Sequence, residues 1–169
     1  METSERPHEL LVSIQEILTS WEVENQWIEP TEEVPYYGLL ARFYLLDGFP
    51  IDWQFCILPK LHESEDFARQ EFLQLFIELS DKVTPEHLDR TLREIAAINL
   101  NLPFGAFGVV EDLQVLYFKH NTLIDIRGNN TPYRSRDRAI TLDILQNQWS
   151  MILYSINRFF ESLMQTLEN

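Results

Sequence analysis

The chain has 169 residues, a length that favours one domain, and its 45% hydrophobic and 12% aromatic content is typical of a globular protein. Its 13 Lys and Arg residues stand against 27 Asp and Glu, and the resulting charge of -14 repels phosphate backbones, so we expect no nucleic-acid partner. The sequence contains no run of eighteen apolar residues and begins without the basic-then-apolar pattern of a secretion signal. We therefore expect a cytoplasmic protein that does not span a membrane.

The sequence carries none of the common motifs for metal, cofactor or nucleophilic chemistry. Cys56 is the single cysteine, which excludes an internal disulfide and a thiolate metal cage. The five glycines form neither a phosphate loop nor a dinucleotide fingerprint, and no two of the four histidines share the i, i+4 spacing of metalloprotease ligands. We therefore expect no metal, no cofactor and no enzymatic activity.

Apolar spacing near the N-terminus predicts a helix followed by a loop. Residues 10–21 carry an apolar stripe with helical spacing, which Thr3 or Ser4 can cap. Residues 22–35 are acidic and flanked by proline. We expect a long loop there, with one short extended patch at Trp27 and Ile28.

The next segments predict a hairpin and a polar loop. Residues 36–46 and 51–58 alternate between apolar and polar positions, which is typical of half-buried strands. Asp47 and Gly48 between them favour a tight turn. Residues 59–70 are polar and predict a loop.

Residues 71–79 fit two structures. A strand would place the four odd-numbered apolar residues on one face, whereas a helix would align Phe72, Phe76 and Leu79. The spacing of the apolar residues alone leaves both open.

A second helix is predicted to begin near residue 85. Thr84 suits the N-cap and Pro85 the first helical position. Leu88, Leu92, Ile95 and Leu102 then follow at helical spacing. We expect Pro103 to end this helix, because the residue before a proline is pushed out of the α region.

A second hairpin is predicted to follow this helix. Residues 104–110 and 113–118 are apolar, and the polar pair Glu111 and Asp112 separates them. Two short apolar runs around a polar break are typical of antiparallel strands joined by a turn.

The C-terminal part predicts a loop and a long helix. Residues 124–138 are rich in loop-forming residues and contain four arginines, Arg127, Arg134, Arg136 and Arg138. Residues 140–167 carry an apolar seam with steps of three and four, which predicts a helix of roughly 40 Å at ~1.5 Å per residue. Because a typical strand spans only ~17–20 Å, part of this helix should overhang the sheet.

Two features are candidates for binding. The arginines of residues 124–138 can pair with a carboxylate-rich segment or a phosphate through bidentate hydrogen bonds. Five large aromatic residues are many for two strands: Trp27, Tyr36, Tyr37, Trp53 and Phe55. Most of them should lie in the core, and any apolar surface left exposed, with Trp27, Tyr36 and Trp53 as candidates, would be a contact for a partner.

The predicted order of elements, α-β-β-β-α-β-β-α, resembles the type III secretion chaperone-like superfamily, which includes the YbjN-like proteins. The block IAAINLNLPFGAFGVVEDLQVLYF is similar to the helix end, the N-x-N motif and the small-residue hairpin of YbjN-like sequences, through Asn99, Asn101, Gly105 and Phe107. FLQLFIEL followed by VTPEHLDRTLREIAAIN looks like the third strand and the helix after it, which favours the strand for residues 71–79. The whole chain is similar to cyanobacterial members of this superfamily.

The resemblance implies one α+β domain over residues 1–169, a twisted antiparallel sheet of about five strands with helices packed on it. It also implies a non-enzymatic module, chaperone- or adaptor-like, that holds a partner polypeptide on the sheet face or along the C-terminal helix. Two other hypotheses remain open at this point. One is a small-ligand or anion sensor, or an enzyme, with a pocket near the arginines of residues 127–138. The other is a structural homodimer built on the seam of residues 140–167.

Overall fold

The computed structural model describes residues 7–32, 34–58, 70–125 and 135–168. Within them the chain forms three α-helices and a six-stranded antiparallel sheet, which confirms the predicted α+β class. The helices are α1 (Glu9–Ser20), α2 (Pro85–Asn99) and α3 (Ser135–Gln165). The strands are β1 (Asn25–Ile28), β2 (Gly38–Tyr44), β3 (Pro50–Leu58), β4 (Gln70–Ser80), β5 (Ala106–Val110) and β6 (Val115–Asp125). They lie in the order β1-β2-β3-β4-β6-β5, and a short 3-10 turn, η2 (Glu111–Leu113), joins β5 to β6.

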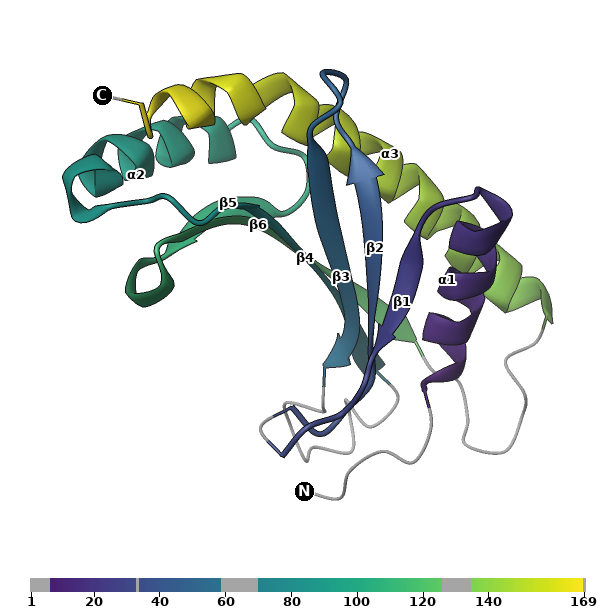
Figure 1. Cartoon of the computed structure of the whole chain (residues 1–169). Coiled ribbons are helices and arrows are strands. Elements are labelled where there is room, and N and C mark those ends of the chain that lie inside the picture. The colour runs from purple at the N-terminus through teal and green to yellow at the C-terminus, as the bar shows by residue number, and fades with distance from the viewer. Residues whose placement is uncertain (1–6, 33, 59–69, 126–134, 169) are drawn as a thin grey trace.

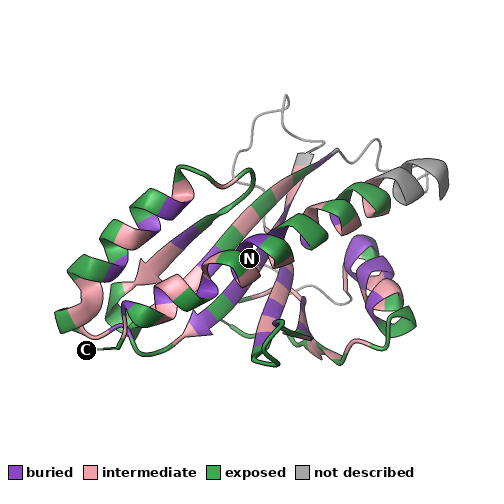
Figure 2. Ribbon diagram, turned by 90° about the horizontal axis from the view of Figure 1, so that it is seen from above, coloured by how far each residue is buried: buried purple, intermediate pink, exposed green. Residues whose placement is uncertain are grey.

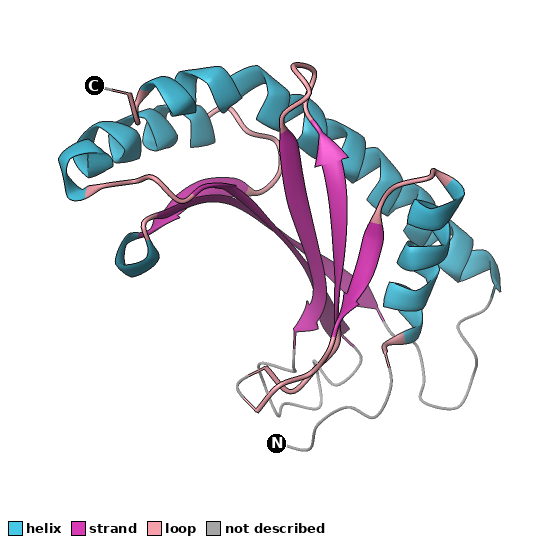
Figure 3. Cartoon of the chain, in the orientation of Figure 1, coloured by secondary structure: helices cyan, strands magenta, loops and turns pink. Residues whose placement is uncertain are grey.

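The three helices lie on one side of the sheet. Figure 1 shows the sheet strongly curved, with α1, α2 and α3 on its convex side, and Figure 3 shows none of the helices of the described residues on the concave side. Ring contacts fix α3 to this arrangement, because Trp149 packs against Phe55 of β3 with centroids 5.2 Å apart and against Trp21 after α1 at 6.3 Å. One face of the sheet is therefore the core, and the described helices leave the other uncovered.

The alternation of side chains along the strands decides which residues enter the core. Most odd-numbered residues of β2, β3 and β4 point towards the helices and are buried, whereas most of their even-numbered neighbours are more exposed. Trp53 and Phe55 have no exposed surface, and Phe118 of β6 is equally buried. Figure 2 shows the same banding of buried and exposed residues along the strands.

Residues 22–35 contain a sixth strand that the sequence did not predict. We expected a loop with a short extended patch, but β1 pairs with β2 over four residues, Trp27 opposite Leu39 among them. The strand is only four residues long and reads Asn-Gln-Trp-Ile, two polar residues followed by two apolar ones, so neither alternation nor an apolar run marks it. The observed order is therefore α-β-β-β-β-α-β-β-α.

Residues 71–79 form a strand, as the resemblance favoured. β4 pairs with β3 on one side and with β6 on the other, which makes it a central strand of the sheet. Leu73, Leu75, Ile77 and Leu79 are all buried against the helices.

The second helix ends earlier than predicted. α2 stops at Asn99 rather than next to Pro103, and Leu92 is 39% exposed. The buried face of α2 consists of Thr91, Ile95 and Ile98. Asn99 is the last residue of α2, and its side chain bonds to the backbone of β5, as described below.

The boundaries around the arginine segment also differ from the prediction. β6 continues to Asp125 and α3 begins at Ser135, so residues 124–125 and 135–138 are not loop. α1 begins with His8 as its N-cap, since the His8 ring accepts the Leu10 N–H at 3.1 Å, and the predicted caps Thr3 and Ser4 lie outside the described residues. The excess length of α3 does not overhang freely, because its C-terminal part packs beside α2 (Figure 1).

Candidate binding surface

The concave side of the sheet is the candidate site, and we call it the open face. It is formed by the even-numbered residues of β1 to β4, the odd-numbered residues of β6 from Tyr117 to Leu123, and the even-numbered residues of β5. Register places these side chains in rows that cross the strands. Three rows matter below: Arg42–Asp52–Glu78–Tyr117, Gly38–Cys56–Gln74–Asn121, and Leu58–Phe72–Leu123.

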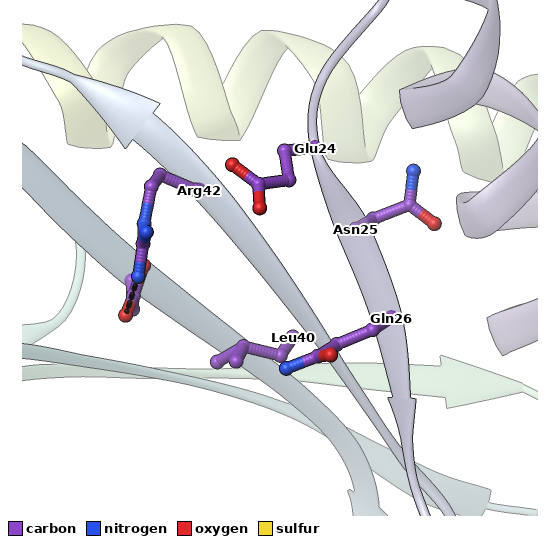
Figure 4. Close-up of a pocket in the computed structure, with 6 residues that line it drawn as sticks. Glu24, Asn25, Gln26, Leu40 and Arg42 are labelled. Carbon is purple, nitrogen blue, oxygen red and sulfur yellow. Dashed lines mark hydrogen bonds and ion pairs between the residues drawn. The ribbon is translucent and has the colours of Figure 1, made fainter.

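The first row carries most of the charge of the open face. The Arg42 guanidinium donates to both carboxylate oxygens of Asp52, from Nε at 2.8 Å and from Nη2 at 2.9 Å. This bidentate pair lowers the pKa of Asp52 and raises that of Arg42, in each case through the hydrogen bonds that favour the charged form. Glu24 lies beside the pair, and Figure 4 shows its carboxylate near Arg42.

The other two rows are uncharged. Gln74 and Asn121 face each other across β4 and β6, and the Gln74 amide lies 3.7 Å from the Cys56 sulfur. Burial raises the pKa of the Cys56 thiol, so it stays protonated at neutral pH and acts as a small apolar group. Leu123 at the end of the third row is 51% exposed. This part of the open face presents apolar and amide groups to solvent.

An aromatic pair joins the charged row to the row beside it. The rings of Phe76 and Tyr117 stack with centroids 5.0 Å apart. Lys119, beside Phe76 in register, supplies the second cation. Among the described side chains of this face, Arg42 and Lys119 therefore balance Asp52 and Glu78, and Glu24 at the margin leaves one uncompensated negative charge.

The hollows on this side are shallow. One, of about 70 Å³, lies between Glu24, Gln26, Leu40 and Arg42 (Figure 4). Another, of about 390 Å³, is open to solvent and lies between Gly105, Tyr117 and Asn121. Enclosed apolar pockets of a few hundred Å³ are typical of small-molecule sites, and neither hollow is of that kind. Among the described residues, no group of His, Cys, Asp and Glu side chains could hold a metal ion. The described part of the open face is therefore a broad surface with shallow hollows.

A second polar region lies between α2 and α3. The Arg90 guanidinium donates to the backbone carbonyls of Thr166 and Glu168, and the buried hydroxyls of Thr91 and Thr166 are 2.9 Å apart. The end of α3 thus receives a cation at its negative pole. Because Arg90 is engaged in this way, the region holds two helices together rather than offering a free anion site.

Two of the three aromatic candidates from the sequence, Trp53 and Trp27, lie away from the open face. Trp53 is fully buried in the core and does not reach the surface. Trp27 is half-buried on the helix side and contacts Tyr37 edge to face with centroids 6.3 Å apart. Tyr36 is also half-buried, and burial raises its pKa. These rings contribute to the core and its margin.

The arginine candidates lie at or beyond the limits of the described residues. Arg127 and Arg134 fall outside them, and Arg136 and Arg138 belong to the first turn of α3, where only the backbone is described. An anion site there stays a prediction. The apolar seam of α3 packs against its own sheet through residues such as Trp149 and Ile156, so that seam is already occupied within the chain.

The open face was not identified from the sequence. The even-numbered residues of β3 and β4 include Gln54, Cys56, Gln74 and Phe76, a mixture that reads as an ordinary solvent face. The signal that could have found it is the low charge of these positions in a chain with a net charge of -14.

None of the described helices combines the length and the apolar character that a membrane crossing requires. Comparison with protein-family models and with curated proteins finds no match to this chain, so the resemblance to the type III secretion chaperone-like superfamily stays a prediction.

Proposed function

We propose that this chain is a non-enzymatic binding module, chaperone- or adaptor-like, that holds a segment of a partner polypeptide on the open face of its sheet. The observation that carries the proposal is the contrast in charge. The chain has a net charge of -14, yet the described side chains of the open face are close to neutral. Within it, the rows Gly38–Cys56–Gln74–Asn121 and Leu58–Phe72–Leu123 contain no charged residue, and a lack of charged residues is typical of the centre of protein–protein interfaces.

The chemistry of the open face suits a polypeptide. Its uncharged rows offer apolar contact through Phe72 and Leu123, and amide groups through Gln74 and Asn121. Carboxamides donate and accept hydrogen bonds, so they can pair with the backbone of an extended segment while apolar side chains take up its side chains. A cytoplasmic setting, where thiols stay reduced, suits the free thiol of Cys56.

Leu123→Asp tests the proposal. The side chain is half-exposed in the uncharged part of the open face, so a carboxylate there should weaken apolar contact with little effect on the core. Leu100→Asp is the matched control, because Leu100 is 87% exposed at the end of α2 and away from the open face. Both variants should retain the far-ultraviolet circular dichroism spectrum of the wild type.

The assay is affinity purification from the native cell with wild type and both variants as baits. We expect one or more polypeptides that the wild type and the Leu100→Asp variant retain and the Leu123→Asp variant loses. The proposal fails if the three baits recover the same polypeptides in the same amounts.

A further inference from the structure

The outer edge of β5 is the starting observation. β5 pairs with β6 on one side only and ends the sheet. Such an edge strand exposes a row of backbone N–H and C=O groups that can pair with a strand from another molecule. Natural proteins usually blunt such edges with a lysine, a proline or a bulge.

β5 has none of these protective residues. Its sequence, Ala-Phe-Gly-Val-Val, contains no charge and no proline, and it consists largely of residues that favour strands. An uncharged and apolar edge of this kind is typical of a strand that associates with copies of itself.

The side chain of Asn99 occupies this edge. Its Oδ1 accepts the Phe107 N–H at 2.9 Å, and its Nδ2 donates to the Phe107 C=O at 3.0 Å. The two backbone groups of one strand residue point to the same side, so both groups of Phe107 face away from β6. A carboxamide has the same donor and acceptor as a peptide unit, and Asn99 therefore takes the place of a neighbouring strand.

Asn101, the second asparagine of the N-x-N motif, bonds to its own helix rather than to the sheet. The Asn101 amide donates to the Ala97 carbonyl at 3.0 Å, within the end of its own helix. The two asparagines have the same side chain and lie two residues apart, but only Asn99 reaches the sheet.

We propose that the outer edge of β5 is a pairing surface for β5 of a second copy of this chain, and that the Asn99 carboxamide keeps it closed. An antiparallel pair centred on Phe107 would place Phe107 opposite Phe107 and Ala106 opposite Gly108, so no charged side chain opposes the approach of the two strands. In that pair the Phe107 groups of one copy would bond to those of the other, which replaces the two bonds to Asn99.

Asn99→Ala is the direct test, with Asn101→Ala as its control. We expect the Asn99→Ala variant to shift, between micromolar and high micromolar concentration, from the wild-type mass to twice that mass in light scattering. The Asn101→Ala variant should keep the wild-type mass. Adding Ala106→Glu to Asn99→Ala should restore the wild-type mass, because two carboxylates would lie diagonally across the new strand pair.

Amide hydrogen exchange gives a second readout that does not depend on a variant that folds. In the wild type we expect slow exchange at the Phe107 N–H, although Phe107 lies at the sheet edge. Fast exchange there overturns the proposal, because Asn99 would then not occupy the edge. A folded Asn99→Ala variant that keeps the wild-type mass at every concentration also overturns it, and a mass increase that Ala106→Glu leaves unchanged assigns the association to another surface.

Discussion

Replacement of Gly105 by alanine tests how the chain turns into β5. Gly105 has φ +66, a left-handed conformation that costs an L-residue about 1–2 kcal/mol. A Cβ atom there would lie 2.7 Å from the Lys119 carbonyl oxygen and 2.9 Å from Cε1 of Phe118, and closer still to its Cζ. Phe118 is fully buried and Lys119 contributes backbone, so neither can move without disturbing the sheet.

Overpacking of this kind costs about 1–3 kcal/mol. Added to the conformational cost, it predicts that Gly105→Ala lowers the free energy of unfolding by roughly 2–5 kcal/mol. Gly48→Ala is the control, since Gly48 also has a left-handed φ of +83 but nothing lies within 4 Å of its Cβ position. It should lose only about 1–2 kcal/mol, and the effect of alanine on the unfolded chain is common to both variants.

Urea denaturation of both variants measures the difference. We expect Gly105→Ala to be less stable than Gly48→Ala by at least about 1 kcal/mol, with unchanged m-values. Equal losses would show that β5 and β6 relax freely around Gly105, and would refute the close approach on which the reasoning rests.

Three further predictions concern single side chains. Burial lowers the pKa of His120, so the native state disfavours its protonated form, while the unfolded chain takes up the proton near pH 6.5. The free energy of unfolding of the wild type should therefore fall more between pH 7 and pH 5 than that of His120→Gln. Equal losses in urea denaturation would contradict this. The hydrogen bonds from Arg42 lower the pKa of Asp52, so the stability they contribute is present at neutral pH and lost as the pH falls below about 4. The melting temperature of an Asp52→Asn variant should therefore fall less between pH 5 and pH 3 than that of the wild type. Thr91→Val removes the buried hydroxyl that pairs with Thr166 at 2.9 Å, and should cost about 1 kcal/mol, or roughly 2–4 °C in a calorimetric melt; an unchanged melting temperature would mean that the pair contributes nothing.

The sequence predicted the parts of the fold that depend on period and turn chemistry. Alternation in residues 36–46 and 51–58, with Asp47 and Gly48 between them, matches the observed β2–β3 hairpin. The spacing in residues 71–79 could not separate strand from helix, because a central strand buried among others carries apolar residues at positions that also fit a helix. β1 was not predicted, because a four-residue edge strand is too short to show a repeat of apolar residues.

The candidate site depended on information that the spacing of residues does not contain. Alternation identified two faces of the sheet but not which helices would cover them or how much of each face would remain open. The aromatic candidates illustrate this limit, because alternation did not show which of them would reach the surface, and Trp53 is fully buried in the core. Asn99 was noticed only as part of a motif, and its bonds to Phe107 depend on the turn between α2 and β5.

The distribution of charge gives the open face a direction. The charged row contains Asp52 and Glu78, with Glu24 beside it, and the uncharged third row contains Leu58. Asp52 and Leu58 are six residues apart along β3, which separates the two rows by about 20 Å at ~3.3 Å per residue. This exceeds the screening length of about 8 Å at physiological salt, so the charges at one end have little influence at the other. A bound segment on this face would therefore be favoured with a basic residue at the Glu24 end and apolar residues over Leu58 and Leu123. An acidic segment would meet repulsion at the first row, and like-charge repulsion is an effective way to reject the wrong partner.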